Sequence, residues 1–148
     1  MVNDMSKPLP RSYIVTGGAG FIGSNLVADL VKQGHKITVI DNLHTGNLAN
    51  LKGIDNLVDF KELTIGEDQI PNGKYDGIYH LGMPSSSPMY KNNKKFITQV
   101  INGAIDLFEY AIKNDLKIVY ASSSSVYNGN EIPFTEDMQI FPTDFYTE

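Results

Sequence analysis

The sequence contains no cysteine. Disulfide bonds and thiolate metal ligands are therefore excluded within these residues. The three histidines, His35, His44 and His80, are scattered and lack the spacing of metal ligands, so we expect no metal site. Apolar runs are too short to cross a membrane, and the polar stretch 1–11 has no signal-peptide core. The sequence therefore predicts a cytoplasmic protein without membrane association.

Positive charge is also scarce. The sequence has twelve Lys and Arg residues and seventeen Asp and Glu residues, which gives a formal net charge of −5. Because nucleic-acid phosphates attract clustered basic side chains, we expect no nucleic-acid partner. The one local basic cluster, Lys91, Lys94 and Lys95, is typical of a solvated helix end. The length of 148 residues and hydrophobic fraction of 41% fit one globular domain with a real core.

The most informative stretch is Tyr13–Gly23, where a β-branched and aromatic run leads into spaced glycines and then a helical pattern. The strand–turn–helix order is what a dinucleotide-binding fingerprint requires. Gly17 allows a sharp turn off the strand, Gly20 allows close approach of a pyrophosphate, and Gly23 lets the helix lie near the strand. The free N–H groups of the helix N-terminus would face the phosphates. The glycine spacing alone also fits a turn that binds nothing.

Asp41 strengthens the fingerprint. It lies 24 positions after Gly17, at the end of the second predicted strand, where an acidic residue is expected. Its carboxylate can accept hydrogen bonds from ribose hydroxyls and would repel a 2′-phosphate, which predicts NAD over NADP. The alternative is a turn-forming Asp before Asn42.

Strand and helix patterns alternate along the chain. This alternation predicts an α/β fold with a doubly wound parallel sheet and a Rossmann-like NAD-binding domain over residues 12–148, preceded by a flexible tail over residues 1–11. A turn-like stretch is expected at 67–73, a loop at 82–88 and another at 128–142. We predict strands at 12–16, 36–40, 57–60, 77–81 and 117–121, and helices at 21–32 and from Phe96 to Ile112 along one apolar face.

The motifs together resemble the extended short-chain dehydrogenase/reductase family, in its nucleotide-sugar epimerase/dehydratase branch and above all the UDP-glucose 4-epimerases. Thr16–Ser24 reads Thr-Gly-Gly-Ala-Gly-Phe-Ile-Gly-Ser, which is highly specific to this group. Asp41–Gly46 follows the epimerase pattern Asp-Asn-Leu-Ser-Thr-Gly, and His80–Met83 stands where the family usually has His-Leu-Ala-Ala. The resemblance covers nearly the whole chain from Ser12 onward.

The resemblance implies NAD as cofactor and a set of residues that hold it. These are Gly17, Gly20, Phe21, Ile22, Gly23, Asp41, Asn42, Leu43, Thr45, Gly46, Thr64, Leu81, Gly82, Ala121 and Ser122. Thr64 stands where the family commonly has an Asp that contacts adenine, and Val100 stands where it often has an Asn. His80 is expected to be a packing residue rather than a catalyst.

The resemblance also implies two catalytic residues. Ser123, three residues before Val126, would hydrogen-bond the reacting sugar hydroxyl, and Tyr146 would be the acid/base. The family Lys four residues after that Tyr would fall at position 150, beyond Glu148. Because a tyrosine acts as a base near neutral pH only beside positive charge, the Lys matters to the mechanism.

The resemblance implies an epimerase acting on a UDP-hexose, and a homodimer that uses the helix around 96–113. Ser124 and Ser125 stand where sugar dehydratases have an Asp-Glu pair, which argues against dehydration. The sequence is expected to be an N-terminal fragment, truncated before the substrate domain and inactive alone. Two alternatives stay open: an NAD-dependent oxidoreductase on another carbonyl or hydroxyl substrate, and a non-catalytic NAD-binding sensor module.

Overall fold

A computed structural model describes residues 9–144 and 146–147. Most of the predicted flexible tail, residues 1–8, therefore lies outside the described residues. The strands are β1 (Ser12–Thr16), β2 (Lys36–Asp41), β3 (Val58–Glu62), β4 (Gly77–His80) and β5 (Lys117–Tyr120). The helices are α1 (Phe21–Lys32), α2 (Ser87–Asn92) and α3 (Lys95–Lys113), with short 3₁₀ helices η1 (Leu48–Leu51), η2 (Asp55–Leu57) and η3 (Ser124–Tyr127).

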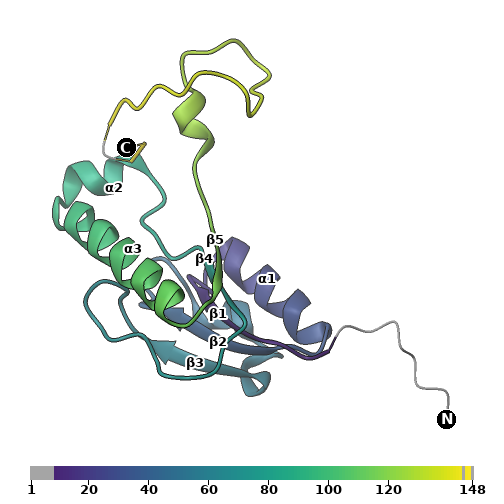
Figure 1. The fold of residues 1–148 in the computed structure, drawn as a ribbon. Coiled ribbons are helices and arrows are strands. Elements are labelled where there is room, and N and C mark those ends of the chain that lie inside the picture. Colours follow the sequence, from purple (N-terminus) through teal and green to yellow (C-terminus); the bar gives the residue numbers. More distant parts are fainter. Residues whose placement is uncertain (1–8, 145, 148) are drawn as a thin grey trace.

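The five strands form one parallel sheet in the order β3-β2-β1-β4-β5. The first strand thus lies in the middle, and the chain builds outward from it in both directions (Figure 1). This is the doubly wound arrangement, and the predicted fold class is confirmed. Its topological switch point lies between β1 and β4.

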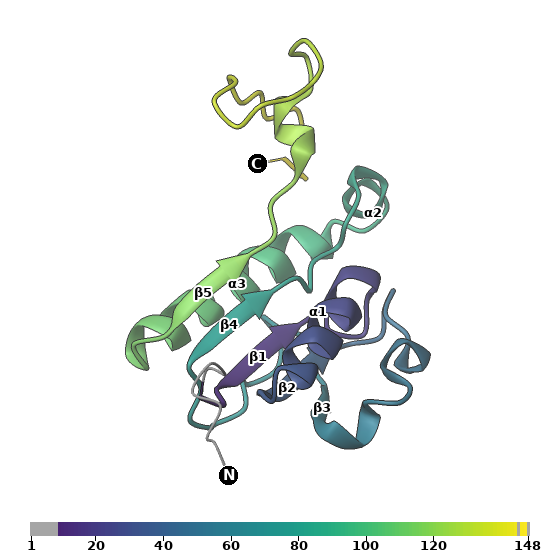
Figure 2. The ribbon, with the colours of Figure 1, turned by 90° about the vertical axis from the view of Figure 1, so that its right-hand side faces the viewer.

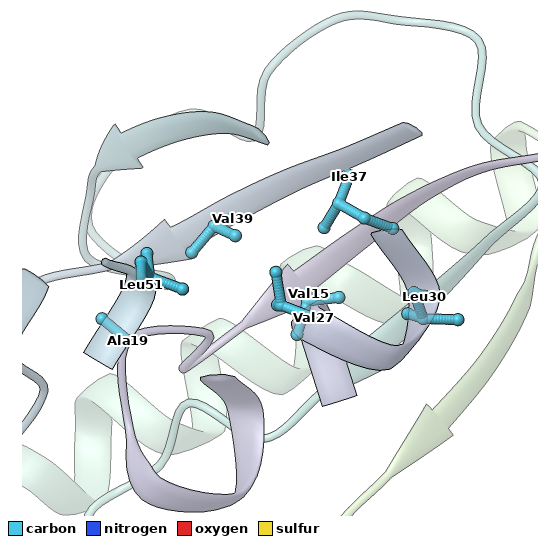
Figure 3. Packing of buried hydrophobic residues seen from close by; sticks show 7 residues of the cluster. All are labelled: Val15, Ala19, Val27, Leu30, Ile37, Val39 and Leu51. Carbon is cyan, nitrogen blue, oxygen red and sulfur yellow. The ribbon is translucent and has the colours of Figure 1, made fainter. Parts of the chain in front are cut away.

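Alternate residues of the central strands pack on opposite faces of the sheet. Val15 and Val39 meet Val27 and Leu30 of α1 on one face (Figure 3). On the other face, Ile14 and Ile78 join a core cluster that includes Leu107 and Ala111 of α3. Figure 2 shows α1 and α3 on opposite sides of the sheet. Burial on both faces explains why Ile14 and Val15, and likewise Val39 and Ile40, are consecutive apolar residues.

The first helix ends as its sequence predicts. Gly34 has a φ of +90°, its N–H donates to the Val31 carbonyl, and the next N–H, of His35, donates to Leu30. This is the Schellman arrangement, which favours glycine because the left-handed conformation strains other residues. The turn sets the entry of the chain into β2 and so fixes where Asp41 emerges.

Three details differ from the sequence-based expectations. The predicted loop at 82–88 runs into α2, which begins at Ser87 and is anchored by the buried Tyr90. The strand expected at 57–60 is shifted to Val58–Glu62. The prediction that α3 has a single apolar face was wrong. The helix buries Gly103, Leu107 and Ala111 and leaves a second apolar stripe exposed.

The chain leaves the sheet after β5 in a long extension. It rises away from the sheet through η3, and its return limb brings the last described residues back beside α2 (Figure 1). The Phe141 N–H donates to the Val126 carbonyl at 2.8 Å, which joins the two limbs. The extension contains the predicted loop at 128–142, which has no helix or strand.

Candidate functional site

The carboxyl ends of the five strands carry the predicted cofactor residues. Parallel strands end at one edge of the sheet, so residues that follow them are brought together there, beside the switch point. Gly17 follows β1, Asp41 ends β2 and Thr64 follows β3. Leu81 and Gly82 follow β4, and Ala121 and Ser122 follow β5.

The glycine turn between β1 and α1 is closely packed. Gly17 has a φ of +68°, and a Cβ there would lie 2.7 Å from the backbone of Gly82. A Cβ on Gly23 would collide with the Gly17 carbonyl. These two glycines therefore allow the turn to touch both its own helix and the segment after β4.

The N-terminus of α1 is open. Gly20 is its N-cap, no side chain caps it, and the first turn contains no acidic residue. The first backbone hydrogen bond back to the cap comes from Ser24. Phe21 and Ile22 lie at this end with 85% and 67% of their surface exposed. Free N–H groups and the positive end of the helix dipole suit an anionic ligand such as a pyrophosphate.

The Asp41 carboxylate is buried and joins two segments. One oxygen accepts from the Ala19 N–H at 3.0 Å, and the other accepts from the Leu43 N–H at 2.8 Å. A Cβ on Gly46 would lie 2.6 Å from that carboxylate, so the loop after β2 wraps closely around it. Each oxygen keeps acceptor capacity for ribose hydroxyls. Thr45 lies exposed on the same loop.

The peptide of Ala19 is held on its other side as well. Its carbonyl accepts from the Asn47 N–H at 3.0 Å and from Asn50 Nδ2 at 2.8 Å. Asn47 is also the N-cap of η1 and accepts from the Ala49 N–H. Asn47 and Asn50 are not among the residues predicted from the sequence, where their only signal is an Asn-rich stretch before a short helical turn.

Asn42 and Thr64 lie together, as their assignment to one ligand requires. Asn42 Nδ2 donates to Thr64 Oγ1 at 3.4 Å, which is a long hydrogen bond. The Thr64 N–H in turn donates to the Asp68 carboxylate at 2.8 Å. The neighbouring acid Asp68, which sequence analysis did not single out, thus fixes the backbone of Thr64.

His80 is buried and makes one defined side-chain hydrogen bond. It is 5% exposed, and its Nδ1 lies 2.6 Å from the Thr16 hydroxyl. Burial lowers the pKa of His80 from its ordinary value of 6.5 to about 4. The imidazole is therefore neutral in the native protein at neutral pH.

Acid should consequently destabilise the protein through His80. Between pH 6.5 and 4 the unfolded chain binds a proton there that the native protein does not, so stability falls as the pH falls. We expect a loss of about 3 kcal/mol of unfolding free energy by pH 4 from this group. Urea unfolding of wild type and His80→Asn at pH 7 and pH 4.5 measures it. An equal acid loss in both proteins would contradict the prediction.

Ser123 and Tyr146 make separate local contacts. The Ser123 hydroxyl accepts from the Ser125 N–H at 3.1 Å and caps η3. The Tyr146 ring lies 5.9 Å from the ring of Tyr90 on α2, and its N–H donates to Asp144. Burial and the neighbouring Tyr146 raise the pKa of Tyr90. Both predicted catalytic groups thus lie on the extension, anchored independently of one another.

Residues 13–147 match the model of the NAD dependent epimerase/dehydratase family. The chain belongs to this family. The match includes the glycine turn, Asp41 and the serine run after β5. The predicted family and its cofactor, NAD, are confirmed at this level.

Family members with different activities are similar to the chain. It is 32% identical to a bifunctional UDP-glucose 4-epimerase and UDP-xylose 4-epimerase of Arabidopsis thaliana, over 92% of this chain and 43% of the relative. It is also 32% identical to a UDP-glucuronic acid decarboxylase of Danio rerio, over 92% of this chain and 33% of the relative. The chain spans between a third and a half of the length of these relatives.

The fold is shared with solved epimerase structures. The UDP-N-acetylglucosamine 4-epimerase of Methanobrevibacter ruminantium, solved with UDP-N-acetylmuramic acid, superposes with a TM-score of 0.82 at 27% identity. The alignment covers 93% of this chain and 46% of that structure.

The family's cofactor fits this edge of the sheet. The uncapped α1 terminus offers donors, a Cβ at Gly17 would fill the turn, and the Asp41 carboxylate offers acceptors at the end of β2. Within residues 9–144 and 146–147, no group of three His, Asp or Glu side chains could hold a metal ion. None of the helices in this described part is both long and apolar enough to span a bilayer.

Proposed function

We propose that the native polypeptide carrying this sequence is a cytoplasmic NAD-dependent epimerase that interconverts UDP-glucose and UDP-galactose at C4. The observation that carries this proposal is the serine run that follows β5. Ser123 occupies the position that contacts the sugar hydroxyl in the family, and Ser124 and Ser125 replace the acidic pair of the dehydratases. The epimerase relative with 32% identity supports the same activity.

NAD would lie along the carboxyl ends of the strands. The α1 N-terminus, with Gly17, Gly20 and Gly23, would bind its pyrophosphate, and the Asp41 carboxylate would bind the adenosine ribose. Asn42 and Thr64 lie beyond Asp41, where the adenine would follow. The segments after β4 and β5, which contain Gly82 and Ser122, would line the nicotinamide end.

The protein's own residues would remove the proton of the sugar hydroxyl and return it. NAD, when bound, supplies reversible hydride acceptance at the sugar carbon. Tyr146 would take the proton from the C4 hydroxyl and return it after the sugar has turned. Ser123 would donate a hydrogen bond to the same oxygen and fix its orientation. Tyr146 would therefore transfer only a proton and Ser123 would only orient the hydroxyl, because the cofactor carries the redox chemistry.

Cofactor preference tests the assignment of Asp41. We expect Asp41→Asn to narrow the preference for NAD over NADP by about tenfold or more, because it removes the charge that repels a 2′-phosphate. Titrations of both cofactors into wild type and variant give the ratio of dissociation constants. Asp59→Asn, a change at an exposed acid paired with Lys61, is the control and should leave the ratio unchanged. An unaltered ratio in Asp41→Asn would remove Asp41 from the ribose site.

The activity itself is tested with the native polypeptide. It is incubated with UDP-galactose and NAD while nucleotide sugars are separated and NADH absorbance is followed. Formation of UDP-glucose without net NADH supports the epimerase. Because a decarboxylase relative is equally similar, the panel also contains UDP-glucuronic acid and other UDP- and dTDP-hexoses.

Each alternative outcome points to a different function. Net accumulation of NADH would indicate an oxidoreductase acting on another carbonyl or hydroxyl. Conversion of UDP-glucuronic acid alone would indicate a decarboxylase. Binding of NAD with no turnover of any substrate would indicate a sensor module, and each of these results would replace the epimerase proposal.

A homodimer is part of the same proposal. Four apolar side chains line one side of α3 with exposed fractions between 40% and 81%: Ile101, Ile105, Phe108 and Ile112. A second copy of the helix would cover this exposed stripe with an equally apolar one. Sedimentation velocity of the native polypeptide distinguishes a dimer from a monomer.

A further inference from the structure

The switch point of the sheet is bridged by a buried pair of side chains. Thr16, the last residue of β1, is in register with His80, the last residue of β4. Their side chains meet through Oγ1 and Nδ1 at 2.6 Å, with exposed fractions of 1% and 5%. At this point the order in which strands are added to the sheet reverses, and a cofactor would cross the sheet here.

The hydrogen bonds of Thr16 favour one tautomer of His80. Thr16 Oγ1 accepts from the Gly82 N–H at 3.1 Å. It also accepts from the Leu81 N–H at 3.2 Å, a donor that it shares with the Thr16 carbonyl at 3.1 Å. A hydroxyl has two lone pairs and one proton, so an oxygen approached by two N–H donors keeps its own proton for a third partner. This arrangement favours donation of the hydroxyl proton to an unprotonated His80 Nδ1, which places the ring proton on Nε2.

The surroundings of His80 keep it neutral. The small cavity beside it is lined by Ile65, Met83, Pro84, Gln99, Val100 and Gly103, none of which is ionisable. From β5 its register partner is Tyr120, an exposed phenol, and from β1 it is Thr16. No charged side chain contributes to the lowered pKa of His80, for which burial is the cause.

The bonded hydroxyl in turn fixes the segment after β4. A Cβ on Gly82 would lie 2.7 Å from the Gly17 nitrogen and 3.1 Å from Thr16 Oγ1, so the two turns are in direct backbone contact. The His80 carbonyl also accepts from the Ala121 N–H at 3.0 Å. Residues that follow β1, β4 and β5 are thereby joined through one histidine.

We propose that His80 is a positioning residue of the cofactor site, which orients the Thr16 hydroxyl so that Leu81 and Gly82 are held against the glycine turn. It acts as a hydrogen-bond acceptor and contributes no proton transfer. The proposal rests on the assignment of the NAD site to this edge of the sheet. It distinguishes His80 from a residue that merely fills space, because an acceptor at the Nδ1 position is what the site requires.

The test compares pairs of variants that keep or remove one atom. Thr16→Val and His80→Leu remove the hydroxyl and the acceptor, whereas Thr16→Ser keeps the hydroxyl and His80→Asn places an amide oxygen near the position of Nδ1. Leu107→Ala creates a cavity in the α3-side core, away from the site, and serves as a stability control. NAD affinity is measured by calorimetry on the native polypeptide at 10 °C, with thermal unfolding midpoints recorded for all variants.

We expect Thr16→Val and His80→Leu to raise the NAD dissociation constant by about tenfold or more. Thr16→Ser and His80→Asn should stay within about threefold of wild type, and Leu107→Ala should keep wild-type affinity although its midpoint falls. ¹⁵N spectra of histidine-labelled wild type should show Nδ1 of His80 unprotonated from pH 8 to pH 5.

Three results would overturn the positioning role. These are equal affinity in all variants, equal weakening by His80→Asn and His80→Leu, and weakening by Leu107→Ala in proportion to its lost stability. If Thr16→Val fails to fold, the comparison of His80→Asn with His80→Leu decides. Wild type that binds no NAD would instead overturn the assignment of the cofactor site, which is a separate failure.

Discussion

Tyr146→Phe should lower kcat for the interconversion of UDP-galactose and UDP-glucose by about 10²- to 10⁴-fold. The substitution removes one oxygen and leaves the ring that lies 5.9 Å from Tyr90, so the local packing is retained. Binding of NAD should be unchanged, because the cofactor residues lie at the strand ends and Tyr146 lies on the extension. Kinetics with UDP-galactose and calorimetry with NAD measure the two properties separately.

Tyr110→Phe is the matched control for this experiment. It also removes one phenol oxygen, which donates to the Pro71 carbonyl at 3.2 Å, far along the chain from the extension. It should cost about 1 kcal/mol of stability and leave kcat unaltered. Full activity in Tyr146→Phe would show that another group moves the proton, whereas loss of NAD binding would show that the phenol holds the cofactor site together.

Gly17→Ala should both destabilise the protein and strongly weaken its binding of NAD. A left-handed φ of +68° strains alanine by about 1–2 kcal/mol. The added Cβ would also press on the Gly82 backbone at 2.7 Å, which makes the total about 2–5 kcal/mol. Because the added Cβ would displace the backbone of the glycine turn itself, we expect the NAD dissociation constant to rise about 100-fold or more.

Gly34→Ala separates the effect of backbone strain from the effect of the contact with Gly82. Gly34 has a φ of +90°, and nothing lies within 4 Å of the position of its Cβ. This variant should therefore show the backbone strain alone, about 1–2 kcal/mol, with wild-type NAD affinity. Urea unfolding and calorimetry on both variants make the comparison. If Gly17→Ala behaves like Gly34→Ala in both measurements, the contact between the two turns is unimportant.

Local patterns were sufficient to predict most of the fold. The helix from Phe21 to Lys32 and the strand at Ser12–Thr16 were predicted with their observed bounds, because glycines delimit both. Burial on both faces makes the strands conspicuous as short apolar runs. The edge at which the site residues gather followed from the rule that parallel strands end together.

What the sequence could not supply was contact between distant segments. The α2 helix is six residues long, too short for a periodic pattern, and depends on burial of Tyr90. Thr16 and His80 are 64 positions apart, and nothing local in either stretch indicates that they are bonded. Asn50 reaches back 31 positions to Ala19 in the same way. Each such bond depends on the completed sheet.

The central place of β1 implies that the molecule can be divided. Strands β1 to β3 lie on one side of the β1–β4 seam and β4 with β5 on the other, and one covalent link, residues 63–76, crosses it. Asn72, Gly73 and Lys74 of that link are exposed, so a protease could cut there without entering either core. Two fragments separated at Gly73 should reassemble through the four strand-register pairs of β1 and β4. The dissociation constant of the two fragments would then measure how strongly the two halves associate along β1 and β4.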